Sequence, residues 1–294
     1  MHRPTLTTHL DKAIRNYMQR AAPATFARAK YLRTRGRLPN LREPQDLSEI
    51  VLSQILSDEV RLYTPYCDKY HVRSILTEWG LGEYLPQLYG YWRSVSDVPI
   101  ADLPDDAIIK PTNGAGRSLA VWDLKGMPMV QAQQALDTAM QRATNIVCTE
   151  PQYAEIPCGY IAERWVGPTT QVPIDYKFMT CGGKIDGILV CTDRSTATRL
   201  SFFDPTWGPK PWIKEKYLPD HLPSRPPDLD IMIGLVECIA GHFDHVRVDL
   251  YAPPGDHPYL GELTFTPQAG YMTYFTDHAI RTMGINWPRT TYAA

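Results

Sequence analysis

Glycine-containing turns between short alternating strands are the feature that most constrains how this 294-residue chain can fold. Three such β-hairpins are expected in its second half, at residues 107–111 with 119–123, 176–181 with 185–192, and 246–251 with 259–265. Asn113-Gly114 between apolar runs is a strong short-range hairpin signal. A further strand is expected at 160–166, and helices at 130–146 and 228–242 lie between the hairpins. Because most strands return directly and few βαβ units can form, the sequence predicts an α+β fold and not a doubly wound sheet.

The first hundred residues are predicted to be mainly helical. Apolar spacing and helix breakers indicate helices at 6–21, 23–35, 46–58 and 69–79. Pro99 and Pro104 then mark a boundary between lobes. With 44% apolar and 21% charged residues, the chain can bury the cores of two lobes, and wholesale disorder is excluded.

Positive charge is concentrated near the N-terminus. Residues 1–42 carry ten Lys/Arg and the single acid Asp11, a balance of +9 against −2 for the whole chain. Such an arm can bind nucleic acid, an anionic membrane surface or an acidic substrate, or it can lie as a solvated helix on an acidic body. Since aromatic residues are sparse in the arm and no nucleic-acid motif is present, we expect no nucleic-acid partner.

Membrane-spanning, zinc-binding and serine-nucleophile signals are missing from the sequence. No apolar run approaches the roughly 18 residues of a transmembrane helix, and residues 1–10 lack a signal-peptide core. We therefore expect a cytoplasmic protein, with peripheral membrane contact through the basic arm left open. The six cysteines lack C-x-x-C spacing and are expected to be reduced core thiols. The eight histidines form no convincing metal pattern, and Gly-x-Ser-x-Gly does not occur.

The third hairpin carries the most informative pattern. Alternation places Arg247 and Asp249 on one face of its first strand, and Glu262 and Thr264 on one face of its second. The turn sets Asp249 almost opposite Glu262, at a Cβ separation of about 5 Å. Two carboxylates this close repel unless a cation lies between them or one takes a proton. The pattern is typical of a magnesium–nucleotide site, although an exposed polar sheet face with solvated charges explains the spacing equally well.

Two other segments have weaker signals for anion and base binding. Lys110 precedes a run of small residues, 112–118, whose backbone N–H groups can surround a phosphate; an ordinary tight hairpin has the same composition. The segment matches neither G-x-x-x-x-G-K-[ST] nor G-x-G-x-x-G. Glu163 is an acid inside an apolar strand, where it can accept a hydrogen bond from an adenine amino group or simply be an edge-strand charge.

Taken in order, these segments resemble the ATP-grasp superfamily, and most closely its TupA-like branch. The resemblance covers about residues 38–287. It is carried by nine segments, at 40–49, 68–73, 84–90, 109–116, 161–163, 175–178, 192–194, 247–251 and 261–265.

The resemblance implies an ATP-grasp fold, in which two α+β lobes hold ATP and Mg²⁺ between them. It implies that a first set of residues binds ATP. Lys69 and Lys110 would bind the phosphates, beneath a glycine-rich lid containing Asn113, Gly114, Ala115 and Gly116. Adenine would contact Glu163 and the backbone of Arg164, Trp165 and Val166, and the ribose would contact Asp175. The chain would divide into a helical basic extension (1–60), a linker region (61–106), a small lid lobe (107–167) and a C-terminal lobe with the metal site (168–294).

The resemblance also implies a catalytic centre in the C-terminal lobe. Lys177, Arg194 and Arg247 would stabilise the transferring phosphoryl group, and Asp249 and Glu262 would hold magnesium. Thr264 stands where the superfamily often has Asn, so a neutral hydroxyl would be the third metal ligand. The Gly-Gly of many relatives is replaced by Pro267-Gln268-Ala269-Gly270, which indicates a remodelled acceptor end.

The activity that this resemblance implies is ATP-dependent carboxylate–amine ligation through an acylphosphate. The partners would be ATP, a small-molecule or sugar-linked carboxylate and an amine acceptor, on a cell-surface polymer precursor or a natural product. Two alternatives remain at this point: phosphotransfer to a hydroxyl, and a non-catalytic nucleotide- or polyanion-binding module.

Overall fold

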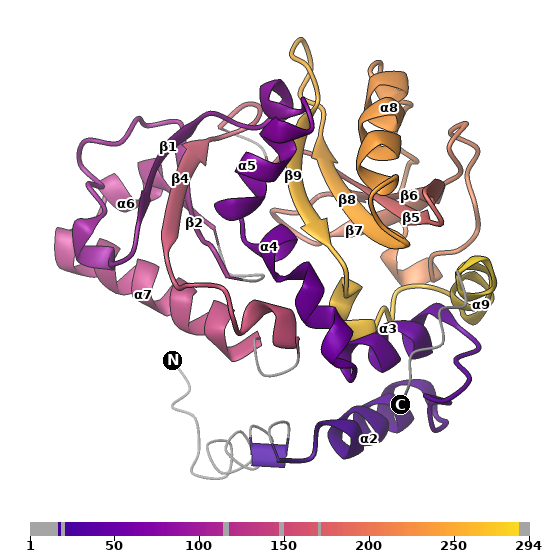
Figure 1. Ribbon diagram of the computed structural model, residues 1–294. Helices are drawn as coiled ribbons and strands as arrows, with labels where there is room; N and C mark the ends of the chain where they lie inside the picture. The colour runs from indigo at the N-terminus through magenta and orange to yellow at the C-terminus, as the bar shows by residue number, and fades with distance from the viewer. Residues whose placement is uncertain (1–16, 19–20, 114–117, 147–149, 170–171, 288–294) are drawn as a thin grey trace.

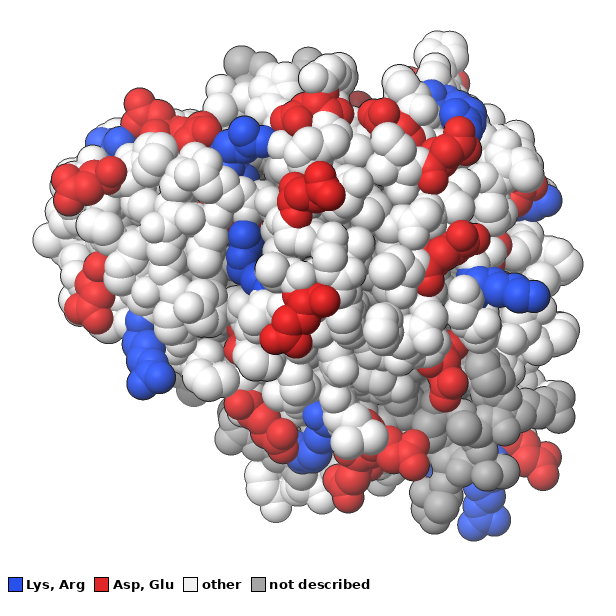
Figure 2. Space-filling model, turned by 45° about the horizontal axis from the view of Figure 1, so that its top comes forward, with Lys and Arg blue, Asp and Glu red and all other residues white. Residues whose placement is uncertain are grey.

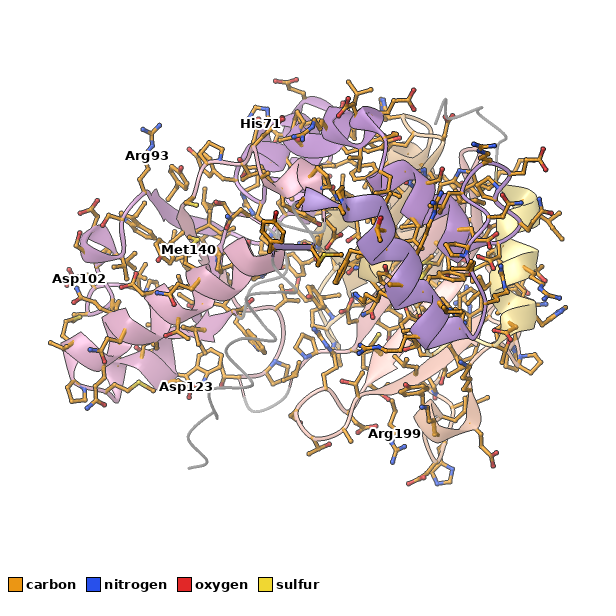
Figure 3. All side chains as sticks on the ribbon, turned by 90° about the horizontal axis from the view of Figure 1, so that it is seen from below. His71, Arg93, Asp102, Asp123, Met140 and Arg199 are labelled. Atoms are coloured by element: carbon orange, nitrogen blue, oxygen red, sulfur yellow. The ribbon has the colours of Figure 1, made fainter. Side chains whose placement is uncertain are left out.

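The computed structural model describes residues 17–18, 21–113, 118–146, 150–169 and 172–287 and places them in two lobes, each built on an antiparallel sheet. The small sheet has the order β1-β4-β2-β3, and the large sheet has the order β7-β6-β5-β8-β9. In Figure 1 the small sheet lies on the left and the large sheet on the right, with α4 and α5 between them. From below, Asp102 and Asp123 mark the small lobe and Arg199 the large lobe (Figure 3). Helices thus cover antiparallel sheets, which confirms the predicted α+β class.

The small lobe turns one face of its sheet to two helices and the other to the large lobe. Its strands are β1 (Leu88–Trp92), β2 (Ala107–Pro111), β3 (Leu119–Ala120) and β4 (Tyr160–Arg164). Ile109 and Ala162 pack in the core beneath α6 (Val121–Lys125) and α7 (Met129–Ile146). Because side chains alternate along a strand, Lys110 and Glu163 point to the opposite face, toward the large lobe.

The large lobe has a core on each face of its sheet. Its strands are β5 (Asp175–Cys181), β6 (Lys184–Thr192), β7 (Arg199–Phe203), β8 (His245–Tyr251) and β9 (Tyr259–Thr264). Phe178 and Val248 pack with α8 (Leu229–Ala240) and α5 (His71–Glu78) on one face. Met179 and Leu189 pack with α3 (Leu47–Ile55) and α9 (Asp277–Asn286) on the other.

Short helices connect these elements. They are α4 (Thr64–Cys67) and the 3₁₀ turns η1 (Asp58–Tyr63), η2 (Gly82–Tyr84), η3 (Val95–Asp97), η4 (Pro151–Tyr153), η5 (Glu215–Tyr217) and η6 (Pro267–Gly270). Within the described part of the chain, no helix has both the length and the apolar character needed to cross a membrane.

Several sequence expectations need correction. The first hairpin does not return as a strand over 119–123: β3 ends at Ala120, and Val121 and Leu124 are instead buried on one side of α6. Strands β1 and β7 and helix α9 were not expected. Cys158 and Cys238 are exposed rather than core residues. The expected helix 6–21 lies largely outside the described residues. The expected linker region 61–106 contributes strand β1 to the small sheet, and the division of the chain into four parts stays a prediction.

Helix α2 (Pro23–Arg35) is attached to the body through basic residues of the arm. Arg37 pairs with Asp46 (2.6 Å) and Glu49 (2.5 Å), and Arg35 donates to the Met272 carbonyl (3.0 Å). These two cations therefore have a structural role. Figure 2 shows acidic and basic side chains interspersed over the face in view, without a large patch of either sign.

Gly284 allows α9 to approach the start of α3, and this contact makes a testable prediction. A Cβ at Gly284 would lie 2.6 Å from the Asp46 Cα and 2.7 Å from the Leu47 nitrogen, both backbone atoms. We expect Gly284→Ala to lower the free energy of unfolding by about 1–3 kcal/mol despite the better helix propensity of alanine. Gly234→Ala in α8, where a Cβ meets nothing within 4 Å, should instead raise it by about 0.5–1 kcal/mol. Urea unfolding of both variants tests this; equal effects would refute the packing argument.

Candidate functional site

A cavity of about 560 Å³ lies between the two sheets and is lined by charged side chains from both lobes. Its volume is in the range of small-molecule sites. The lining includes most of the site residues expected from the sequence, namely Lys69, Lys110, Glu163, Arg164, Trp165, Val166, Asp175, Lys177, Arg194, Asp249 and Glu262. Residues from β2, β4, β5, β8 and β9 thus meet at one place.

The two carboxylates of the third hairpin face one another across β8 and β9, as predicted. Asp249 is directly opposite Glu262 in the strand register. Asp249 accepts two hydrogen bonds from Arg247, at 2.7 and 2.8 Å, and a third from Lys177. Burial alone would raise the pKa of Asp249, but Arg247 and Lys177 outweigh it and hold the pKa below its ordinary value. Two cationic side chains of the protein thus offset the negative charge of Asp249.

Glu262 is held by a lysine from a distant part of the chain. Lys69 Nζ lies 2.9 Å from Glu262 Oε1, and the backbone nitrogen of Lys69 donates to the Thr112 carbonyl (3.3 Å) at the end of β2. Burial raises the pKa of Glu262, but Lys69 and Arg247 together outweigh it and hold the pKa below its ordinary value. Lys69 thus joins the small sheet to the metal-binding candidate on the large sheet.

Asp175 and Lys177 extend this charged row along β5. Lys177 Nζ lies 2.7 Å from Asp175 Oδ2, and Arg194 lies 3.5 Å from the same oxygen. Burial raises the pKa of Asp175, in part offset by Lys177. Its other oxygen, Oδ1, is buried and accepts no hydrogen bond from the described residues. A buried acceptor without a donor at a cavity wall fits a ligand hydroxyl.

A second charged group lies on the small sheet. Glu163 accepts from Lys110 on the neighbouring strand, and Arg73 Nη1 lies 3.5 Å from its second oxygen. Arg73 also donates to the Pro86 carbonyl at 2.5 Å. Since Glu163 already has two cationic partners, its expected contact with an adenine amino group stays a prediction.

The segment after β4 connects the lobes at one end of the cavity. The backbone nitrogens of Arg164 and Trp165 donate to the carbonyls of Gln87 (2.8 Å) and Asp106 (2.7 Å). The Arg164 side chain crosses to the large lobe, where it contacts Tyr259 and Asp256. This end of β9 therefore lies beside the segment Arg164–Val166, which leads from one lobe to the other and which we call the hinge.

Positive charge exceeds negative charge in this cluster, which suits an anionic ligand. Its cations are Lys69, Arg73, Lys110, Lys177, Arg194 and Arg247, and its carboxylates are Glu163, Asp175, Asp249 and Glu262. No group of three or more His, Cys, Asp or Glu able to hold a metal occurs among the described residues. Two facing carboxylates fit Mg²⁺, which commonly takes one or two carboxylates and completes its shell with phosphate oxygens and water.

Some expected residues lie beside the cavity rather than in its wall. Arg247 and Thr264 contact one another at 3.0 Å behind Asp249, so the Thr264 hydroxyl already accepts one bond. Asn113 is buried and donates to Cys158. Gly114, Ala115 and Gly116 lie outside the described residues.

Sequence reasoning missed two residues that belong to this cluster. Tyr251 lines the cavity, and the strand alternation that placed Arg247 and Asp249 on one face also places Tyr251 there. Arg73 lies within segment 68–73, one of those that carry the family resemblance, but its contact with Glu163 spans ninety positions and leaves no local signal.

Comparison with known proteins gives a family match and several distant structural likenesses. The profile of the family described as TupA-like ATPgrasp matches residues 49–286. No curated protein matches the sequence. A D-alanine–D-alanine ligase from Bacillus anthracis, complexed with ATP, is 14% identical, with a TM-score of 0.43 over 78% of this chain and 67% of its own.

Two further solved structures are similar at the same level. An L-amino acid ligase from Bacillus licheniformis is 17% identical, with a TM-score of 0.38 over 67% of this chain, which spans only 42% of that protein. The ATP-grasp ligase PsnB, complexed with minimal precursor, Mg and ADP, is 14% identical, with a TM-score of 0.38 over 90% of this chain and 68% of its own.

Proposed function

The chain belongs to the TupA-like ATP-grasp family, and from this premise we propose that it is an ATP-dependent carboxylate–amine ligase that releases ADP and phosphate. The observation that carries the proposal is the facing pair Asp249 and Glu262, set in a cation-rich cavity between the two lobes. The substrate would be a carboxylate of a cell-surface polymer precursor or natural product, joined to an amine.

In this proposal each part of the nucleotide would bind at a different place in the cavity. We place the base at the hinge backbone of Arg164–Val166, and a ribose hydroxyl at the unpartnered Asp175 Oδ1. Lys69 and Lys110 would turn from their carboxylate partners to the phosphates, since both lie in the cavity wall. Asp249 and Glu262 would hold Mg²⁺, with Thr264 as a weaker candidate ligand because Arg247 already donates to its hydroxyl.

The proposed reaction needs positioning and charge neutralisation more than covalent help from the protein. The substrate carboxylate attacks the γ-phosphate of ATP, giving an acylphosphate and ADP; the amine then attacks the acyl carbon and phosphate leaves. Lys177, Arg194 and Arg247 would offset the charge of the transferring group. Bound Mg²⁺ would supply Lewis-acid stabilisation of phosphoryl oxygens.

The test is to follow oxygen atoms from the acid. The protein is incubated with ATP, Mg²⁺, pooled amines and pooled acids whose carboxylates carry heavy oxygen. We expect ADP as the nucleotide product and heavy oxygen in the released phosphate, because the acylphosphate oxygen leaves with phosphorus. AMP with pyrophosphate would refute the acylphosphate route, a stable phosphoester without free phosphate would indicate a kinase, and ATP binding without turnover would indicate a binding module.

A further inference from the structure

A buried hydrogen-bond chain ends on Glu150, a carboxyl that the reaction proposed above does not use. Glu150 is only 8% exposed, although it lies in a loop between the lobes. The hydroxyl of Thr266 donates to Glu150 Oε1 at 2.5 Å, and the side-chain amide of Gln152 donates to the Thr266 oxygen at 2.6 Å. Gln152 and Thr266 are 0% and 1% exposed, so the small exposed surface of this chain belongs to Glu150.

The position of Thr266 places Glu150 beyond the phosphate end of the cavity. Arg164 contacts Tyr259, the first residue of β9, at the hinge where we place the base. Glu262 lies further along β9, and Thr264 and Thr266 follow on the same side at intervals of about 7 Å. Thr266, at the far end of this row from the hinge, donates to the Glu150 carboxyl. An acyl group activated at the phosphates would meet its amine on this side.

Several charged and titratable groups act on Glu150 from different elements. Burial is the largest influence and, together with the negative charge of Glu262 on β9, raises the pKa of Glu150. The Thr266 hydrogen bond, Arg247 on β8 and Lys30 on α2 lower it, and the net result is a pKa of about 7. Among the described residues, Cys67 on α4 and Tyr153 on η4 are further titratable groups that interact with it. The carboxyl is therefore poised between its two protonation states near neutral pH.

The hydrogen-bond chain can serve both of these states. With Glu150 ionised, Gln152 donates to Thr266 and Thr266 donates to the carboxylate, as observed. The amide oxygen of Gln152 is buried and accepts no hydrogen bond from the part of the chain that the structure describes. If the amide turns over, its oxygen accepts from Thr266, whose own oxygen then accepts from protonated Glu150. A group that takes up and returns a proton needs hydrogen-bond partners that can stabilise both its ionised and its protonated form.

We propose that Glu150 is the general base of the second half-reaction and takes a proton from the attacking amine, an inference that rests on the ligase function proposed above. The ammonium form of the amine gives one proton to the Glu150 carboxylate and becomes neutral. The amine nitrogen then forms a bond to the acyl carbon, the bond from that carbon to the phosphate oxygen breaks, and the second nitrogen proton goes to the leaving phosphate. Glu150 returns its proton to water before the next turnover.

The experiment separates the two half-reactions with two nucleophiles. Wild-type protein and Glu150→Gln are incubated with ATP, Mg²⁺ and the acid pool, and with either the amine pool or hydroxylamine. Hydroxylamine is mostly unprotonated at neutral pH, so it captures an acylphosphate as a hydroxamate without a base. Glu155→Gln, an exposed neighbour whose carboxylate pairs with Arg61, is the matched control.

We expect Glu150→Gln to form hydroxamate within about threefold of wild type and amide at least about 10²-fold more slowly. The rate of amide formation by wild type should rise as pH increases through about 7, where Glu150 ionises. The residual rate of Glu150→Gln should not show this rise. Thr266→Val, which breaks the chain but keeps the carboxyl, should lower only amide formation.

Three outcomes would overturn the assignment. Unchanged amide formation in Glu150→Gln would remove Glu150 from the reaction. If Glu150→Gln lowers hydroxamate and amide formation equally, the substitution affects folding or phosphoryl transfer and not the second half-reaction. Thermal unfolding with and without Mg·ADP would distinguish these two causes. If wild type forms neither product, the ligase proposal itself fails and the role of Glu150 with it.

Discussion

Glu262→Gln is expected to reduce ADP formation by at least about 10³-fold while leaving the protein folded. The substitution keeps the shape of the side chain but removes the charge that faces Asp249 on the neighbouring strand. A metal held by one remaining carboxylate would stabilise the transferring phosphoryl group less, and a loss of about 4 kcal/mol corresponds to this change in rate. ADP release is measured with saturating ATP and Mg²⁺.

Two controls make this result specific to the site. Glu155→Gln removes an exposed carboxylate that pairs with Arg61 and should leave ADP formation unchanged. Thermal unfolding checks the fold, because Glu262→Gln also removes the ion pair between Lys69 and Glu262. Turnover by Glu262→Gln within about threefold of wild type, in a folded protein, would remove Glu262 from the metal site.

The register of Asp249 and Glu262 could be predicted from sequence because it depends on local rules. Side chains alternate with a period of two, and one turn fixes which residues face each other, so Asp249 and Glu262 were matched correctly across β8 and β9. The same alternation separates Lys110 from Ile109 on β2, with one in the cavity wall and the other in a core. Patterns of this kind need no knowledge of distant residues.

Contacts between distant segments could not be predicted in this way. Lys69 and Glu262 are 193 positions apart, and Glu150 and Thr266 are 116 apart, so no periodicity connects either pair. Failure at 119–123 has a different cause. Val121 and Leu124 fit a short helix as well as a strand, and packing against the small lobe decides between them. The family resemblance supplied Lys69, whereas Glu150 emerged only from the folded arrangement.

Arg247→Met is expected to destabilise the protein by about 3–5 kcal/mol, the largest effect on stability that we predict. The guanidinium donates two hydrogen bonds to Asp249 and one to Thr264 in a buried position. Methionine fills much of the volume but leaves Asp249 buried with Lys177 as its remaining cationic partner. A buried charge that has lost its partner destabilises a protein strongly, whereas removing both charges of a buried pair destabilises it much less. We therefore expect the double variant Arg247→Met/Asp249→Asn to recover part of the loss.

Chemical unfolding over a range of pH distinguishes this electrostatic cause from a packing defect. In wild type, Arg247 and Lys177 hold the folded-state pKa of Asp249 below its ordinary value, so the carboxylate contributes stability above that value and loses it as pH falls further. In Arg247→Met the pKa of Asp249 rises, and protonation relieves the buried charge. The difference in the free energy of unfolding between Arg247→Met and wild type should thus become smaller below about pH 4. Arg225→Met, at an exposed pair with Asp230, should change stability by less than about 0.5 kcal/mol at any pH. If the loss of unfolding free energy in Arg247→Met does not depend on pH, lost packing and not the unpaired carboxylate causes the destabilisation.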